Sequence, residues 1–343
     1  MGQARPVLAI VCPGQGSQTP GFLQPWLDLP HVADQLAWLS AVSGVDLVTH
    51  GTTSDAETIR DTAVAQPLIV ASALVGWRSL AAAIGTDEGQ GSNHGSGGSH
   101  GSDGVALAAD VVAGHSVGEM AAAALTGVLS IEQAIVLVRE RGLAMAAASA
   151  VAPTGMSAVV GGDPAEVEAA IAAQGLTAAN RNGAGQVVAA GTREQLDALA
   201  AAAPAKARVI ALQVAGAFHT HHMAPAVDVL ASLSRALSPA DPDTRLLSNA
   251  DGAVMDDGAT VLARLVSQVS NPVDWQACMA TMAGLGVTGI LELPPAGTLV
   301  GLAKRALPGV ELLALRTPDD LSAARDFVAA HAGTTATTHG ATR

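Results

Sequence analysis

Short apolar segments alternate with longer helical patterns along the first half of the chain. Residues 7–12, "VLAIVC", have the length and composition of a buried strand, and residues 63–84 follow with the length of a helix. The apolar segment 105–113 and the helical pattern of residues 131–149 repeat that order. Strands that alternate with helices predict an α/β fold with a mostly parallel sheet.

The pattern changes in the middle of the chain. We predict three strands separated by two helices, in the order 155–162, 163–175, 185–192, 193–203 and 207–214. Further apolar segments at 246–252 and 286–293 predict additional strands of the main sheet. We therefore expect a small α/β subdomain of residues 153–213, inserted in a core formed by residues 1–152 and 214–330.

Two segments lack the apolar residues that a core needs. The run that ends at residue 104 is rich in Gly, Ser and His, and we expect a flexible surface loop over residues 86–104. The C-terminal residues 331–343 are small and polar, and we expect a disordered tail there.

Composition and charge restrict the classes of partner. The chain has 343 residues, of which 49% are hydrophobic, so it is long enough for a large core and a second subdomain. Its formal net charge of −13 argues against nucleic acid as a main partner. An acidic partner would need a local basic patch, because the field of the whole protein would repel it.

The sequence also gives expectations about compartment. The first apolar run is only six residues long before Pro13 and Gly14, which is too short for a signal peptide. We find no apolar run of the roughly 20 residues that a membrane span requires. Cys12 and Cys278 are interpreted as buried small hydrophobes without a disulfide. We expect a cytoplasmic protein without a membrane partner.

Ser116 is the first candidate for catalysis. It lies in "GHSVG", residues 114–118, after an apolar strand pattern and before an Ala-rich helical pattern. A nucleophilic serine at a sharp turn requires this strand–turn–helix context, and flanking glycines permit the turn. The second match, "GGSHG" at 97–101, lies in the Gly/Ser-rich loop and lacks that context. We interpret Ser116 as a nucleophile.

Arg141 is the second candidate. Ala134, Val138, Arg141 and Met145 follow one another at helical spacing and share one face of the predicted helix. A buried arginine needs an anionic partner, because an unpaired buried charge is too costly. The spacing alone leaves two interpretations open, a structural salt bridge or a substrate carboxylate held by the guanidinium.

Histidines and a glycine-rich loop complete the candidate chemistry. "GAFHTHHMAPA" contains His219, His221 and His222, and no acidic or Cys residue stands at a metal-ligand spacing, so we expect no metal site. One of the three histidines is a candidate base for Ser116, and His219 is expected at a strand end. Residues 12–21, "CPGQGSQTPG", lack a nucleotide-binding pattern and suit main-chain donors for an oxyanion.

Five ordered motifs resemble one family. "PGQGSQ", "GHSVGE", "RG", "GAFH" and "QVSNPVDW" are similar to the acyltransferase family of fatty acid and polyketide synthesis, above all to its stand-alone bacterial members, over about residues 7–318. The resemblance implies a hydrolase-like α/β core and a ferredoxin-like subdomain at residues 153–213. It departs at 294–297, where this chain has "PPAG" and the family often has "GPGK".

The resemblance implies roles for individual residues. Ser116 is the nucleophile and His219 its base, and a main-chain carbonyl at Gln268 orients the imidazole in place of a carboxylate. The main-chain N–H groups of Gln15 and Val117 form the oxyanion hole.

The resemblance also implies the reaction. Arg141 holds the carboxylate of malonyl-CoA, Phe218 favours malonyl among acyl groups, and the malonyl group passes through Ser116 to acyl carrier protein for fatty acid synthesis. No metal or bound cofactor is implied.

Alternative functions remain. A serine thioesterase or esterase shares the nucleophile turn, but Asp163 and Asp197, which lie between Ser116 and His219 in the chain, are expected at a helix start or in a surface helix and not at a strand end. A non-catalytic docking module for carrier proteins would not need both Ser116 and His219. An acyltransferase that loads a polyketide carrier would share every motif.

Overall fold

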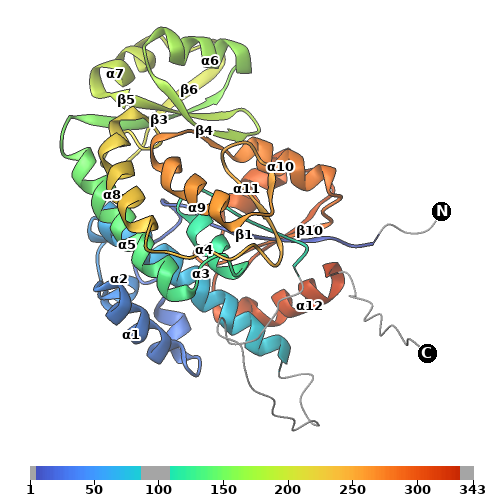
Figure 1. Cartoon of the computed structure of the whole chain (residues 1–343). Coiled ribbons are helices and arrows are strands. Elements are labelled where there is room, and N and C mark those ends of the chain that lie inside the picture. The colour runs from blue at the N-terminus through green and yellow to red at the C-terminus, as the bar shows by residue number, and fades with distance from the viewer. Residues whose placement is uncertain (1–4, 86–108, 333–343) are drawn as a thin grey trace.

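The computed structural model describes residues 5–85 and 109–332 of the chain. The predicted loop 86–104 and residues 333–343 of the predicted tail lie outside the described residues, as does the second serine motif. The described residues form a core around a six-stranded sheet and a smaller part around a five-stranded sheet, which lies at the top of Figure 1.

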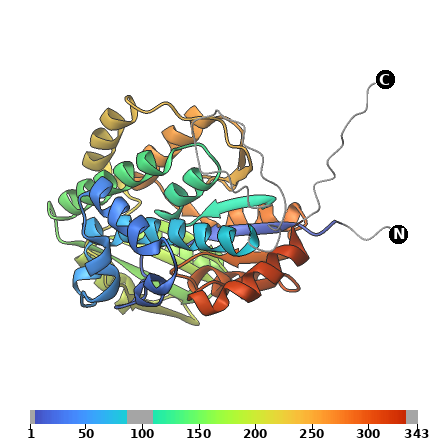
Figure 2. The same cartoon turned by 90° about the horizontal axis from the view of Figure 1, so that it is seen from below.

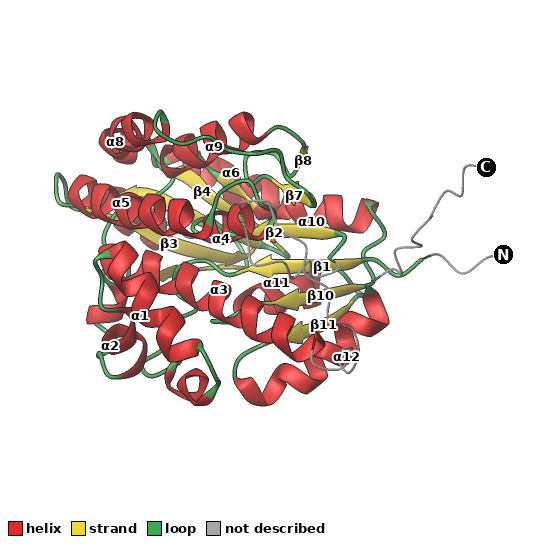
Figure 3. Cartoon of the chain, turned by 60° about the horizontal axis from the view of Figure 1, so that its bottom comes forward, coloured by secondary structure: helices red, strands yellow, loops and turns green. Residues whose placement is uncertain are grey.

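The core sheet is mostly parallel. Its strand order is β11-β10-β1-β2-β7-β8, and every neighbouring pair is parallel except β7 and β8 (Figure 3). The strands are β1 (Leu8–Cys12), β2 (Val111–Gly114), β7 (Arg245–Leu247), β8 (Val254–Met255), β10 (Gly289–Glu292) and β11 (Glu311–Ala314). The predicted strands near 7–12, 105–113, 246–252 and 286–293 correspond to β1, β2, β7 and β10.

Both faces of the core sheet are covered by helices, as alternation along β1 shows. Leu8 and Ile10 pack on one face, and Ala9 and Val11 pack on the other. The core cluster on the first face contains residues of α1 (Val32–Ser43), α3 (Thr62–Gly85), α4 (Gly118–Leu125), α5 (Ile131–Ser149), α8 (Ala224–Ser234), α9 (Gly258–Ser267) and α12 (Leu321–His331). The second face is covered by α10 (Trp275–Gly284) and α11 (Thr298–Ala306). Figure 2, the view from below, shows α3 and α12 over the first face.

Helix α3 corrects one expectation from the sequence. It is 24 residues long and, by length and composition, apolar enough to cross a membrane, although the sequence analysis found no such run. The polar residues Gln66, Ser72 and Arg78 interrupt its apolar pattern. In the molecule 61% of its most apolar window is buried, chiefly against α5, as in the core helix of a packed domain.

The smaller part has the chain order β3 (Thr154–Gly161), α6 (Pro164–Ala173), β4 (Thr177–Gly183), β5 (Gln186–Thr192), α7 (Arg193–Ala201) and β6 (Ala207–Ala211). Its sheet order is β6-β3-β5-β4, extended by β9 (Val273–Asp274) from the core, which pairs in parallel with β4. The βαββαβ order with antiparallel strands is that of a ferredoxin-like fold. The predicted fold class is therefore confirmed, while the boundaries 153 and 213 stay a prediction.

Two details of the prediction were wrong. Strand β4 was missed, because its sequence "TAANRNG" contains Asn and Gly, which are rare in strands. The predicted tail began too early, because His331 is the last residue of α12 and only 7% exposed, with its Nδ1 2.9 Å from the hydroxyl of Thr288. The remaining helical segments of the described chain are the short helix α2 (Leu47–Thr52) and five 3₁₀ helices, which carry the symbol η: η1 (Gln24–Asp28), η2 (Thr58–Arg60), η3 (His221–Met223), η4 (Gln268–Ser270) and η5 (Pro318–Asp320).

Candidate active site

A cavity of about 250 Å³ lies where the core meets the sheet of the subdomain. The loops that follow β1 and β2 and the first turns of α11, the helix that follows β10, line it from the core, at the carboxyl ends of parallel strands, where ligands of open α/β sheets bind. Strands β3, β4 and β5 line it from the subdomain. The cavity wall contains six of the residues that the sequence analysis selected: Gln15, Ser116, Val117, Arg141, Phe218 and His219.

Ser116 sits in the sharp turn between β2 and α4. Its φ is +53°, a left-handed conformation that side chains other than Gly rarely adopt. The turn brings two stretches of backbone together: a Cβ on Gly114 would lie 2.1 Å from the Gly118 carbonyl carbon, and one on Gly118 would lie 2.2 Å from the Cys12 carbonyl oxygen. The turn therefore requires both glycines and holds Ser116 at the cavity wall, at the N-terminal end of α4.

Gly114→Ala is expected to destabilise the protein by about 3 kcal/mol or more, because the backbone atoms of Gly118 and Glu119 cannot move away from the added methyl group. The free energy of unfolding in urea measures this loss. Gly301→Ala is the matched control, since Gly301 lies inside helix α11 with no atom within 4 Å of an added Cβ. It is expected to stabilise by about 0.5–1 kcal/mol. Equal effects at both positions would contradict the close approach at the turn.

Ser116 and His219 form a hydrogen-bonded pair. Ser116 Oγ lies 2.7 Å from Nε2 of His219, and Nδ1 of the same ring lies 2.8 Å from the main-chain carbonyl oxygen of Gln268. A carbonyl can only accept, so Nδ1 carries the proton and Nε2 is free to accept the hydrogen of the Ser116 hydroxyl. This is the arrangement of a nucleophile with a general base.

The placement of His219 differs from the expected strand end. Strand β6 ends at Ala211, and His219 lies in a turn before η3 with a φ of +61°. Its main-chain N–H donates to the carbonyl of Val269 over 3.0 Å, which attaches this turn to the segment that carries Gln268. Asp163 and Asp197 lie in the subdomain, as the N-cap of α6 and within α7, as the sequence analysis expected.

The environment of His219 keeps its ring neutral. Burial and the nearby charge of Arg141 together lower the pKa of His219 to about 3, although the hydrogen bond that its ring donates to the Gln268 carbonyl acts in the opposite direction. At neutral pH the imidazole is therefore unprotonated and able to accept a proton.

Arg141 is 1% exposed and directs its guanidinium at the pair. Nη1 donates to Oε1 of Gln66 over 2.6 Å, and Nη2 donates to Oε1 of Gln268 over 2.9 Å and to Ser116 Oγ over 3.3 Å. Within the described residues no carboxylate lies at ion-pair distance, and the guanidinium Nε has no hydrogen-bond partner. Burial lowers the pKa of Arg141 to about 10, so it is still a cation at neutral pH. Two neutral amides hold a buried positive charge next to Ser116.

The main-chain donors of the cavity differ in availability. The N–H of Ser116 is taken by Oδ1 of Asn249 over 2.7 Å. The N–H groups of Gln15 and Val117, by contrast, have no acceptor among the described residues, and both residues line the cavity. These are the two donors that the resemblance selected for an oxyanion.

The other selected residues take varied positions. Phe218 is 6% exposed and lines the cavity beside His219. His221 and His222 stack on each other with ring centres 4.1 Å apart and do not line the cavity. In the described part of the chain no group of three or more His, Cys, Asp or Glu residues could hold a metal ion.

Four further polar residues surround the site and were missed by the sequence analysis. Gln66 and Asn249 bind Arg141 and Ser116 as described above, Asn182 bonds the His115 ring over 2.9 Å, and Glu119 bonds both Gln268 and Asn249. Glu119 is the last residue of the motif "GHSVGE", and its place in that motif is the one feature of the sequence that could have selected it. The three amides come from distant parts of the chain and have no distinctive spacing.

Comparison with known proteins identifies the family. Residues 99–325 match the model of the acyl transferase domain. The chain is 49% identical to the malonyl CoA-acyl carrier protein transacylase of Mycobacterium tuberculosis over 316 residues, which cover 92% of this chain and 98% of that protein. The crystal structure of MCAT from Mycobacterium tuberculosis superposes with a TM-score of 0.84 at 48% identity, covering 92% of this chain and 99% of that one.

A third comparison includes a bound partner. A malonyl-transacylase in complex with its type II PKS acyl-carrier protein is 29% identical, with a TM-score of 0.80, over 93% of this chain and 99% of that one. The family model covers well over half of the chain, and the relative of known name spans nearly all of it. The chain therefore belongs to the acyl transferase family.

Proposed function

We propose that this enzyme transfers the malonyl group from malonyl-CoA to the phosphopantetheine thiol of an acyl carrier protein, and so supplies fatty acid synthesis. The observation that carries the proposal is a buried arginine without a carboxylate partner, 3.3 Å from the hydroxyl of a serine that is paired with a neutral histidine. A substrate that is both a thioester and a carboxylate suits that combination. The relatives named above bear the same activity in their names.

The first half-reaction acylates Ser116. Its Oγ attacks the thioester carbonyl of malonyl-CoA, and its proton passes to Nε2 of His219, whose Nδ1–H stays on the Gln268 carbonyl. The carbonyl oxygen becomes an oxyanion, which the free N–H groups of Gln15 and Val117 stabilise. The C–S bond then breaks, CoA leaves with the proton from His219, and malonyl remains as an ester on Ser116.

The second half-reaction reverses these steps with another thiol. The phosphopantetheine thiol gives its proton to His219 and attacks the malonyl ester, and Ser116 leaves with that proton. No bound cofactor takes part in the scheme, because each substrate carries its own thiol arm.

Acyl choice rests on Arg141 and Phe218. The guanidinium forms a charged hydrogen bond with the malonyl carboxylate. This bond takes the place of the hydrogen bonds that the carboxylate makes with water, and it lies next to the thioester that reacts. Phe218 lies beside His219 in the wall and limits the volume available to a branch on the acyl chain.

A serine thioesterase is the alternative enzyme, since it would share Ser116, His219 and the oxyanion donors. A buried cation has no purpose for neutral acyl esters, which favours the transferase. The solved complex of a malonyl-transacylase with a type II PKS acyl-carrier protein also keeps open a polyketide carrier as the acceptor.

Intact-protein mass spectrometry tests the proposal in two steps. Mixing the enzyme with malonyl-CoA is expected to give one malonyl adduct on the enzyme. Adding phosphopantetheine-bearing acyl carrier protein is then expected to remove that adduct, and the carrier protein is expected to gain the mass of a malonyl group. Steady release of CoA without an adduct and without carrier would instead indicate a thioesterase. If the enzyme gave no adduct and released no CoA, both the transferase and the thioesterase function would be contradicted.

A further inference from the structure

Glu119 is a buried carboxylate that the proposed reaction does not use. It lies in the first turn of α4, three residues after Ser116, and is only 6% exposed. Its Oε1 accepts the main-chain N–H of Asn249 over 2.6 Å, and its Oε2 accepts the side-chain amide of Gln268. Both partners of Glu119 are therefore donors.

Gln268 connects Glu119 to Arg141 and His219. Its side-chain NH2 group faces Glu119, which leaves its Oε1 facing Nη2 of Arg141 over 2.9 Å. Its main-chain carbonyl accepts Nδ1–H of His219 over 2.8 Å. One residue thus orients both the cation and the base.

Asn249 connects Glu119 to Ser116. With its own N–H bound to Glu119, it accepts the N–H of Ser116 with Oδ1 and donates Nδ2 to the carbonyl of Gly114, each over 2.7 Å. These two bonds hold both sides of the strained turn that carries the nucleophile.

A carboxylate determines the direction of these bonds, because it can only accept. A side-chain amide can rotate by 180° and exchange its donor and acceptor ends. If the group facing Gln268 could donate, Gln268 could turn its NH2 toward Arg141 and repel it. Burial raises the pKa of Glu119 above its usual value, whereas the hydrogen bonds from Asn249 and Gln268 and the charges of Arg141 and Arg264 lower it. If Glu119 were protonated, its O–H would face an N–H group of Asn249 or Gln268, which is itself a donor. The ionised form, which only accepts, therefore fits the site.

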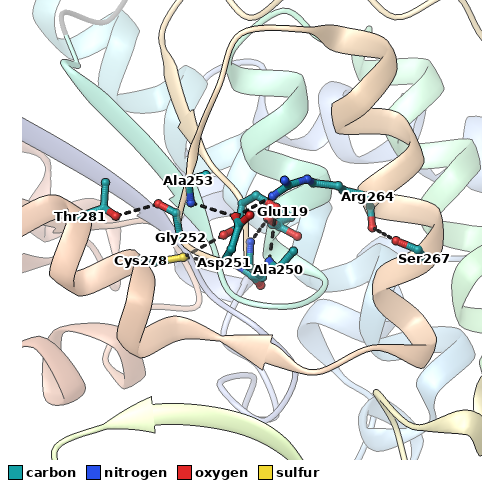
Figure 4. A network of polar contacts seen from close by, with 11 residues as sticks. Glu119, Ala250, Asp251, Gly252, Ala253, Arg264, Ser267, Cys278 and Thr281 are labelled. Atoms are coloured by element: carbon teal, nitrogen blue, oxygen red, sulfur yellow. Dashed lines mark hydrogen bonds and ion pairs between the residues drawn. The ribbon is translucent and has the colours of Figure 1, made fainter.

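A second cation, Arg264, lies near Glu119. Arg264 of α9 reaches toward Glu119 and donates Nη1 to Asp251 over 2.6 Å, beside the loop 250–253 (Figure 4). The positive charges of Arg141 and Arg264 both lower the pKa of Glu119.

We infer that Glu119 is a positioning residue for acyl selection: its carboxylate fixes the amide of Gln268 so that an acceptor faces Arg141, and thereby aims the guanidinium at the substrate carboxylate. The inference rests on the proposed function. It adds to that function a residue that touches no substrate and acts through Gln268.

Glu119→Gln tests the inference, because it keeps the shape and exchanges one acceptor for a donor. The measured quantity is the rate of Ser116 acylation by malonyl-CoA divided by the rate with acetyl-CoA. We expect Glu119→Gln to lower this ratio about tenfold or more, as a charged hydrogen bond is misaligned. Glu119→Asp keeps an acceptor-only group and is expected to keep the ratio within about threefold, even if its shorter side chain lowers stability.

A purely structural role predicts the opposite order, with the shorter Asp at least as harmful to the ratio as the isosteric Gln. That order, or an unchanged ratio in Glu119→Gln, would overturn the inference. If Glu119→Gln does not fold, Gln268→Met removes the connecting amide while keeping the main-chain carbonyl. It must then lower the same ratio about tenfold or more, and an unchanged ratio would overturn the inference.

Glu292→Gln is the matched control. Glu292 is fully buried and accepts three main-chain N–H groups at the start of α11, but it does not contact Gln268, Arg141 or Ser116. The Glu292→Gln variant is expected to be less stable than the wild type and to keep the ratio of the malonyl-CoA to the acetyl-CoA acylation rate. A wild-type enzyme without a malonyl adduct would refute the proposed function, whereas an adduct with an unchanged ratio in the variants would refute this inference alone.

Discussion

Ser116→Ala is expected to abolish the malonyl adduct and to lower transfer to the carrier protein by about 10⁴-fold or more. The hydroxyl lies 2.7 Å from a base and at the N-terminal end of α4, in a cavity that Gln15 and Val117 also line, and the N–H groups of these two residues have no acceptor among the described residues. The alanine methyl group fits the same turn, so folding is expected to persist. Intact-protein mass spectrometry and single-turnover rates with malonyl-CoA measure both effects.

The matched control for this change is Ser17→Ala. Ser17 also lines the cavity and bonds the hydroxyl of Thr298 over 3.1 Å, but it has no base. It is expected to keep the adduct. An adduct that survives Ser116→Ala would require another nucleophile. Cys12 and Cys278 are poor candidates, because burial raises the pKa of each thiol well above its usual value.

The elements with strong local patterns could be predicted from the sequence. The helix at 131–149 has apolar residues at helical spacing, and Ser130 and Gln133 form a capping box at its start. That helix alone fixes Arg141 on the buried face. The turn at Ser116 was equally predictable, because an apolar strand, two glycines and a helix stand in direct succession.

What the sequence could not provide is set by distant contacts. Strand β4 pairs with β5 and β9, and those pairings stabilise a segment whose own residues disfavour a strand. Its Asn180 and Asn182 reach the cavity wall only through that pairing. In the same way Gln66 approaches Arg141 across 75 positions of the chain, and Asn249 approaches Ser116 across 133. An amide side chain fits many environments, so its position alone predicts no role.

Arg141→Ala is expected to lower the rate of acylation by malonyl-CoA about 10- to 150-fold relative to acetyl-CoA, the value of one charged hydrogen bond of about 1.5–3 kcal/mol. The reason is local. The guanidinium lies 3.3 Å from the nucleophile and has no carboxylate at ion-pair distance within the described residues, so the substrate carboxylate is expected to form that pair. The rate with acetyl-CoA is expected to change little, because that substrate has no carboxylate. Single-turnover acylation rates with the two thioesters measure the ratio.

Arg139→Ala, two residues earlier in the same helix, separates this effect from a loss of charge in general. Arg139 is 42% exposed at its side chain and pairs with Glu140, so its removal is expected to leave the ratio unchanged. An equal loss of both rates in Arg141→Ala would mean that the arginine only supports the fold of the site, through Gln66 and Gln268. If the ratio of the malonyl-CoA to the acetyl-CoA acylation rate falls while the rate with acetyl-CoA persists, Arg141 must contact the malonyl carboxylate itself. A thioesterase for neutral esters would not show this fall in the ratio.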